Sequence, residues 1–107
     1  MSKFIISTRI NDEFQFNLKA ENGQVILTSQ GYTTKASCEN GIESVRENSA
    51  AIENFECNKS SDNRDYFNLK AANHQVIGTS EMYSSKTAMD TGIASVMKSA
   101  PLATIED

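Results

Sequence analysis

The 107-residue chain carries 10 Lys and Arg against 14 Asp and Glu, a net charge of −4, and 38% of its residues are hydrophobic. This length fits one globular domain, because two domains of half the size would each be close to the lower limit of independent stability. The scattered basic residues disfavour nucleic-acid binding, since a phosphate backbone is normally met by a concentrated positive patch. The apolar runs are too short to span a membrane, and the first residues turn polar too early for a secretory signal, so we expect a cytoplasmic protein.

The first elements in chain order are three predicted strands. A strand over residues 3–10 joins through Asn11-Asp12 to a second strand, whose Phe14, Phe16 and Leu18 alternate with polar residues as in a half-buried strand. Asn22-Gly23 then predicts a two-residue type I′ hairpin turn, which needs positive φ at both central positions. The return strand is predicted over residues 24–29.

A two-residue turn at Asn22-Gly23 fixes the register of this hairpin. Leu18 is then expected to face Leu27 on the core side of the sheet. On the opposite side Lys19 faces Ile26, and Asn17 faces Thr28.

A helix is predicted from about residue 34 to residue 48. Thr33 and Thr34 are N-cap candidates, because their hydroxyl oxygens can accept a hydrogen bond from a free amide of the first turn. The expected buried face contains Cys38, Ile42, Val45 and Ser49. Gly41 lies on the same face, where its cost in helix propensity indicates a close backbone approach to the sheet.

The second half of the chain repeats the first with a shift of 51 residues. Residues 16–45 align without a gap on residues 67–96, and 17 of the 30 aligned positions are identical. The same elements are therefore predicted again: strands before and after Asp62-Asn63, a hairpin at Asn73-His74, a helix over 85–99 and a short last strand over 102–106. Ser84 and Ser85 are the N-cap candidates of the second helix.

The duplication predicts a single α+β domain over residues 1–107, made of repeat one (1–54) and repeat two (55–107). One repeat has a single helix to cover its sheet, which leaves apolar surface in water. Two repeats side by side form one continuous antiparallel sheet with both helices on the same face and a shared core, related by a pseudo-two-fold axis. Residues 52–57 are expected to close the first repeat while opening the second. We expect a monomer that is internally a pseudo-dimer.

The segment FNLKAANHQVIGTSEMY and the helical GIASV resemble the duplicated YegP-like family, a group of small uncharacterised bacterial proteins. The resemblance covers nearly the whole chain. It implies two β-β-β-α-β units that share one sheet and exchange their C-terminal strands, an arrangement that single-repeat relatives reach as homodimers. The chain departs from it at Gly31, where repeat two has Met82, and at the Asn-Gly turn, where repeat two has Asn-His. The resemblance implies no activity, substrate or catalytic residue.

The two cysteines and the one histidine are interpreted as structural. Cys38 takes the place of Met89, and Cys57 takes the place of Ile6, so both are expected to be buried as small hydrophobic residues. His74 has no second histidine with which to form a metal site, and it occupies a turn position where the other repeat has glycine. No catalytic residue, metal ligand or cofactor is predicted, although two carboxylates can still converge in the fold.

The strongest candidate site is the sheet face opposite the helices, which we call the outer face. Its predicted members recur in both repeats. They are Asn17, Lys19, Thr28, Asn68, Lys70 and Thr79, extended in repeat two by Tyr66 and Glu81, where repeat one has Gln15 and Gln30. Polar residues are also ordinary on a solvated antiparallel face, so this pattern alone does not establish a function.

A weaker candidate is the pair Lys35 and Lys86 in the first turns of the two helices, where the helix dipole disfavours a cation. Each follows a tyrosine, Tyr32 or Tyr83, by three residues. The tyrosines are expected to pack against the helices and the lysines to be exposed. The alternative is a pair of anion or partner contacts.

Three functions are compatible with these patterns. The first is a non-catalytic binding or interaction module that uses the outer face or an exposed edge strand. The second is a small enzyme with a carboxylate site or a site around Tyr83 and Lys86, which requires a pocket that holds groups of perturbed pKa. The third is weak single-stranded nucleic-acid binding, for which Tyr66 is the one obvious exposed stacking residue.

Overall fold

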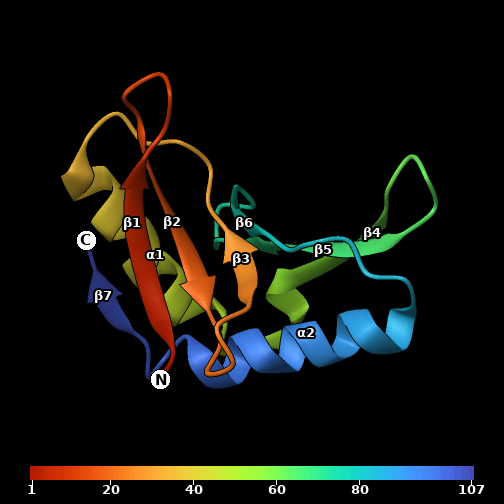
Figure 1. Cartoon of the computed structure of the whole chain (residues 1–107). Helices are drawn as coiled ribbons and strands as arrows, with labels where there is room; N and C mark the ends of the chain where they lie inside the picture. The colour runs from red at the N-terminus through yellow and green to blue at the C-terminus, as the bar shows by residue number, and fades with distance from the viewer.

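The computed structural model describes residues 1–107 and shows the two repeats joined in one seven-stranded sheet (Figure 1). The elements are β1 (Lys3–Thr8), β2 (Phe14–Lys19), β3 (Val25–Thr28), α1 (Lys35–Asn48), the 3₁₀ helix η1 (Ile52–Asn54), β4 (Phe55–Lys59), β5 (Asp65–Lys70), β6 (Val76–Thr79), α2 (Lys86–Ser99) and β7 (Thr104–Glu106). The strand order is β4-β5-β6-β3-β2-β1-β7, so β3 and β6 meet in the middle. The predicted α+β fold with two tandem repeats is confirmed.

Both helices cover one face of the sheet and leave the outer face free (Figure 1). The core is shared between the repeats, because α1 packs on β2 of its own repeat and on β5 and β6 of the other, while α2 packs on β5 and β3. Its fully buried side chains include Phe16 and Leu18 of repeat one and their equivalents Phe67 and Leu69. Apolar side chains from both repeats are thus buried together in one cluster.

The four hairpin loops share one geometry, and it is not the predicted one. In the first repeat the Ala20 amide donates to the Gln24 carbonyl and the Gly23 amide donates to the Ala20 carbonyl, so the loop has three residues. Only its last residue has positive φ: Gly23 (83°), and likewise His74 (68°), Asp12 (66°) and Asn63 (67°) in the other loops. The predicted type I′ turn with two positive φ angles is therefore wrong, although His74 does adopt the predicted positive φ.

The extra loop residue is compensated by a β-bulge beside Lys19 and Lys70. Lys19 pairs with Val25, and not with Ile26 as the two-residue turn had predicted; Lys70 pairs with Val76 in the same way. Beyond the bulge the predicted pairs Asn17–Thr28 and Leu18–Leu27 are confirmed. A bulge sets two residues of one strand against one of its partner, which lets the neighbours Ile26 and Leu27 both face the core.

Hydroxyl caps start both helices, as predicted. The Thr34 side chain accepts from the Ser37 amide at 3.0 Å, and Ser85 accepts from the Ala88 amide at 3.1 Å. Gly41 makes room for the Tyr32 hydroxyl, and Gly92 for that of Tyr83, so the predicted approach of sheet backbone is instead an approach of tyrosine rings. No helix has both the length and the apolar character needed to cross a bilayer.

The exchange of last strands occurs on one side only. β7 leaves repeat two and pairs with β1 of repeat one, and because this pairing is parallel the sheet is mixed, not wholly antiparallel. The equivalent residues of repeat one form η1 and continue directly into β4, so residues 52–57 do not add a closing strand. β4 therefore ends the sheet without a neighbour on its outer side, and Cys57 is exposed there, contrary to its predicted burial. Cys38 is buried as predicted.

Candidate binding site on the outer sheet face

The outer face gathers the predicted polar residues of both repeats across the middle of the sheet. Each repeat contributes the same set from its second and third strands. The structure places Asn17, Lys19 and Thr28 on one side of the pseudo-two-fold axis and Asn68, Lys70 and Thr79 on the other, all half-buried. In repeat two the Thr79 hydroxyl donates to the Asn68 side chain at 2.8 Å. The predicted set therefore shares one surface.

The two repeats meet at a narrow seam. Thr28 and Thr79 form the one residue pair that joins β3 to β6, whereas the strands within each repeat pair over several residues. Beyond this pair β3 and β6 separate. A seam held at one point leaves space on the outer face between the two repeats.

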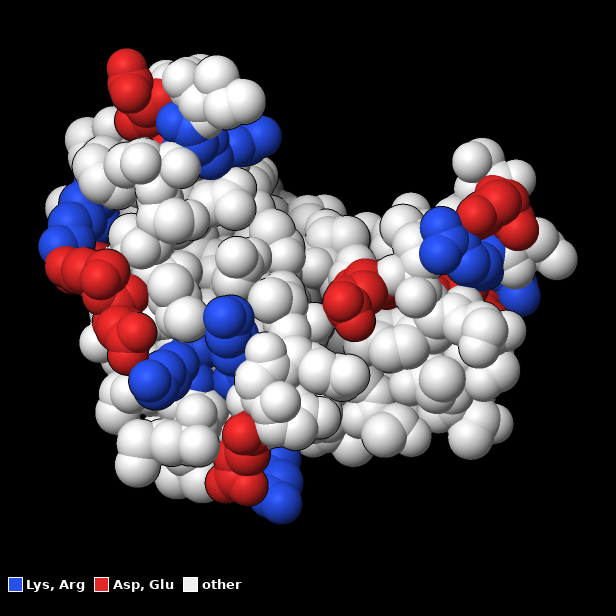
Figure 2. All heavy atoms as spheres, viewed as in Figure 1, with Lys and Arg blue, Asp and Glu red and all other residues white.

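This space is a groove of about 560 Å³, which we call the seam groove. Its walls come from equivalent positions of the two repeats. They are Val25 with Val76, Thr28 with Thr79, Ser29 with Ser80 and Gln30 with Glu81, together with Gly78. Figure 2 shows the molecular surface hollowed between the two halves. The groove combines apolar walls with hydroxyl, amide and carboxylate groups, a mixture that suits a polar ligand more than an apolar one.

Two buried serines shape the groove at its rim. The Ser29 hydroxyl accepts from the Phe16 amide at 2.9 Å and donates to the Gln30 carbonyl at 2.8 Å. Ser80 makes the same two contacts with the Phe67 amide and the Glu81 carbonyl. Because each hydroxyl replaces a ladder partner at the end of a short strand, the backbone turns there and carries the following polar residue to the groove.

The lysines of this face are not equivalent. Lys70 binds Glu56 at 2.7 Å, and this contact, with a further one from Asn58, holds the pKa of the Glu56 carboxyl below its ordinary value. Lys19 forms no ion pair, because the position equivalent to Glu56 is occupied by Ile5. Lys19 pairs with the groove residue Val25 across the hairpin, so the two residues are neighbours on the outer face. The groove thus has one uncommitted cation beside it.

Tyr66 lies on the outer face of β5 opposite Asn58, well toward the β4 end of the sheet. It is half-buried, and the core phenylalanines Phe16 and Phe67 are fully buried. A single aromatic side chain on the face offers a poor platform for stacked bases.

The helix-start lysines do not join the outer face. Lys35 and Lys86 lie on α1 and α2, on the other side of the sheet, and they bind Asp107 and Asp90 respectively. Hydrogen bonds to these carboxylates raise the pKa of both ammonium groups. A lysine acts best as a general base when its pKa is lowered, so these shifts run opposite to that role.

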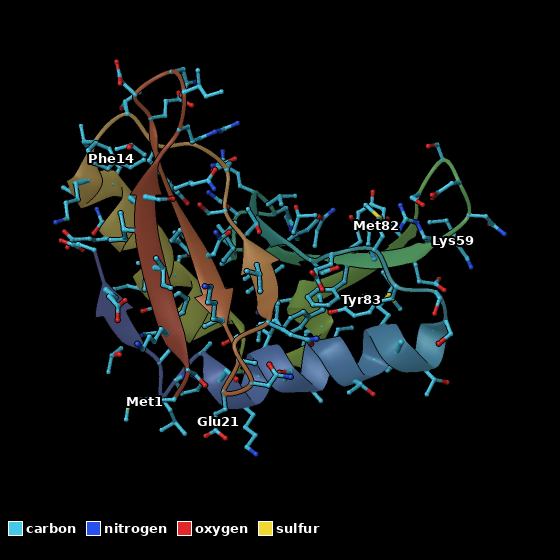
Figure 3. The ribbon with its side chains drawn as sticks, viewed as in Figure 1. Met1, Phe14, Glu21, Lys59, Met82 and Tyr83 are labelled. Carbon is cyan, nitrogen blue, oxygen red and sulfur yellow. The ribbon has the colours of Figure 1, made fainter.

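Tyr83 is a packing residue in this structure. Figure 3 shows it between the sheet and α2, where its ring stacks on Phe67 at 6.3 Å and its hydroxyl meets Gly92. Burial is the main cause of its raised pKa. Lys86 is not in the pocket that Tyr83 helps to line, and its side chain is 75% exposed. Nothing in this arrangement supports the predicted Tyr83–Lys86 enzyme site.

The sequence interpretation missed the two valines of the groove. It placed Ile26 and Ile77 on the outer face, and the structure places Val25 and Val76 there. The run Val25-Ile26-Leu27 was the available signal, since three successive apolar residues cannot all alternate between faces. No three His, Cys, Asp or Glu side chains come together as a possible metal site.

Comparisons with known proteins agree with the fold. The model of the family described as "Domain of unknown function (DUF1508)" matches the chain twice, over residues 11–56 and 60–107. A UPF0339 protein of Shewanella oneidensis is 53% identical over 95% of this chain and 93% of its own. The solution structure of YegP from E. coli, titled a protein of unknown function, gives a TM-score of 0.94 at 48% identity over 99% of this chain and 91% of its own. A second solution structure, of a UPF0339 protein from Shewanella oneidensis, gives 0.92 at 51% identity, covering 99% of this chain and 90% of its own.

Proposed function

Because this chain belongs to the DUF1508 family, whose function is unknown, we propose its function from its own surface: it is a non-catalytic module that binds a polar ligand in the seam groove. The observation that carries this proposal is the groove itself, built from equivalent residues of both repeats on the face that the helices leave free. A site that requires both repeats gives the duplication a role beyond completing the core.

The chemistry of the groove indicates the kind of ligand. Thr28 and Thr79 offer hydroxyl groups at its centre, and the two valines offer apolar contact on either side. Lys19 is free to meet an anionic group at one end, while Glu81 places a carboxylate on the other repeat. A ligand that lies across the axis with an anionic group toward repeat one and a hydrogen-bond donor toward repeat two fits this distribution.

The direct test compares ligand capture by the wild-type chain, by a quadruple variant of the outer face and by a control variant. Changing Asn17, Lys19, Asn68 and Lys70 together to Ala removes the flanking polar groups and leaves the buried core untouched. We expect this variant to remain folded and to lose capture of the metabolites or proteins that the wild-type chain retains from native lysate, as identified by mass spectrometry. A matched control carries Asn40→Ala and Lys98→Ala on the exposed sides of the helices, and it should retain capture.

A single substitution tests the contribution of Lys19 apart from that of Lys70. Lys19→Glu reverses the charge of the uncommitted cation, so we expect it to weaken the binding of any captured anionic ligand by about tenfold, corresponding to about 1.4 kcal/mol. Unchanged capture by the quadruple variant would remove the outer face as the binding surface, whatever the result for Lys19.

A further inference from the structure

The two ends of the sheet are built from equivalent strands but are covered differently. β1 at one end carries β7 along its outer side, whereas the equivalent strand β4 at the other end carries nothing (Figure 1). An uncovered edge strand presents backbone N–H and C=O groups in the geometry that another strand needs. The covered end therefore serves as a template for what the open end can hold.

Backbone contacts hold β7 in place on β1. The strands run parallel, with Lys3 opposite Thr104 and Phe4 opposite Ile105, and the Thr104 amide donates to the Ser2 carbonyl at 3.3 Å. Just before the strand, Ala103 is buried and its carbonyl accepts from the guanidinium of Arg46 at 2.7 Å. The segment is thus fixed at its start by a small buried residue and a charged donor.

Carboxylates hold the other part of this segment. Glu106 binds Lys3 at 3.0 Å across the edge. Asp107, just past the strand, binds Lys35 in the first turn of α1. The covered edge therefore holds an extended segment that begins small and apolar and ends in acidic side chains.

The open edge of β4 has the backbone groups to do the same. Cys57 lies opposite Phe67, whose amide and carbonyl are both engaged with Ser80 on the far side of β5. In an antiparallel pair of this type the opposite residue directs its own N–H and C=O away from the pair. The backbone groups of Cys57 consequently face the open edge, and its side chain is exposed, while the equivalent Ile6 is 7% exposed.

A cation also lies at the position that matches Lys35 beside β7. Lys86 is the equivalent of Lys35, in the first turn of α2. Its ion pair with Asp90 is an exposed contact within one helix, one turn apart, and such pairs are weak and exchange readily. Lys59 lies at the far end of β4 (Figure 3).

We propose that the β4 edge binds an extended peptide segment of a partner protein, which adds to the sheet parallel to β4 and places an acidic side chain on Lys86. The partner differs from β7 in two places: at its start, because Met97 replaces Arg46, and at the position of Glu106, because Asn54 replaces Lys3 and offers no cation there. A more apolar first residue, without the guanidinium contact to its carbonyl, suits the first of these positions. This site is separate from the seam groove and does not depend on it.

The size of the edge argues for a peptide over a second copy of the chain. β4 has five residues, and pairing two such strands from two copies buries on the order of a few hundred Å², well below the roughly 1,200 Å² of stable protein interfaces. A peptide that adds one strand gains the backbone hydrogen bonds without having to bring two folded surfaces together.

The test uses the one segment that is seen to fit the equivalent edge. The full ¹⁵N-labelled chain is titrated with a synthetic peptide of residues 101–107 (PLATIED), acetylated and amidated so that only its side-chain carboxylates are charged. We expect amide shifts centred on Cys57, Lys59 and Lys86, with a dissociation constant of about 1 mM or lower. A lack of shifts at about 5 mM peptide would overturn the proposal, as would shifts confined to β1, which would show exchange with the chain's own β7.

Two variants and a control sharpen the result. Cys57→Pro removes the N–H that faces the edge and leaves the ladder between β4 and β5 intact, so it should weaken peptide binding by about tenfold. Lys86→Glu should weaken it by about as much through charge repulsion, and Lys98→Glu on the same helix should not change it. Equal binding by wild type and both edge variants would contradict the proposal, and so would dimerisation through β4 in sedimentation experiments.

Discussion

The two repeats agree closely where each packs against the helices and differ where they meet and where the sheet ends. Phe16 and Phe67 are both fully buried, and each stacks on its tyrosine at the same centroid distance of 6.3 Å. At the seam, in contrast, repeat two has Gly78 at the position of Leu27, and the Leu27 side chain fills the space beside Gly78. The difference shows which constraints survive duplication: positions inside a repeat must keep their packing, while positions at the pseudo-two-fold axis share one volume and are free to become unequal.

The seam gives the comparison with the largest expected effect. A Cβ on Gly78 would lie 2.6 Å from Leu27 Cδ2, so the leucine occupies space on both sides of the axis. We expect Leu27→Ala to lower the free energy of unfolding by about 2–5 kcal/mol, because it leaves a cavity where the repeats join. Urea denaturation followed by circular dichroism measures this change.

Moving the leucine from position 27 to position 78 is the control for that prediction. Gly78→Leu alone should cost about 1–3 kcal/mol by overpacking, whereas Leu27→Ala combined with Gly78→Leu should recover much of the loss. Additive losses in the double variant would show that the two positions do not share one volume, and that their difference has another origin.

The ends of the sheet give the next comparison, through Arg46 and its equivalent Met97. The Arg46 guanidinium donates to the Ala103 carbonyl, binds Glu43 and lies 5.5 Å from the centroid of the Phe4 ring. Arg46→Met, which installs the repeat-two residue, should lower the free energy of unfolding by about 1–2 kcal/mol and loosen β7 first. Hydrogen exchange should speed up at Thr104 and Glu106 before it does elsewhere.

The reciprocal change, Met97→Arg, is made in the repeat whose edge strand β4 has no outer neighbour. Met97→Arg should leave the exchange of β4 amides unchanged, since no segment lies beside that edge, and should cost about 1 kcal/mol because Met97 is partly buried against the core. If Arg46→Met instead lost protection from hydrogen exchange throughout the sheet, β7 would unfold together with the core and not separately at the edge.

These differences also mark how far the sequence could predict the structure. The repeats, both helices with their Thr34 and Ser85 caps, and the buried alternating residues follow from local chemistry, which is the same wherever the segment lies. The register did not follow, because Asn22-Gly23 is compatible with loops of two or three residues, and only the bulge beside Lys19 distinguishes them. This register error of one residue placed Ile26 on the outer face, where the structure has Val25.

The missed burial of Cys57 has a different cause. Its equivalent Ile6 belongs to a strand that β7 covers, and the duplication suggested the same surroundings for both. The number of strands available is set by the whole chain, however, and the linker through η1 uses the residues that would have formed the second cover. The seam groove was unpredictable for a similar reason, since it exists only through the way Thr28 and Thr79 join the repeats.

The outer face gives the comparison with the smallest expected effect. Glu56 binds Lys70 in repeat two, and the pKa of its carboxyl is lowered mainly by that hydrogen bond. A carboxyl with a lower pKa in the folded than in the unfolded state stabilises the fold above its unfolded pKa, and this contribution disappears as the pH falls through the folded pKa. Both groups are accessible to solvent, so the change in stability should be small, and the pKa itself, followed by carbon NMR of the side-chain carboxyl, is the sharper measurement.

In Lys70→Ala the pKa of the Glu56 carboxyl should rise toward the ordinary glutamate value. In Lys19→Ala it should stay where it is, because Lys19 belongs to the repeat that has Ile5 in place of the carboxylate. An equal shift in both variants would mean that Glu56 senses the charge of the whole face and not one partner, and Lys19 would then no longer count as the uncommitted cation beside the groove.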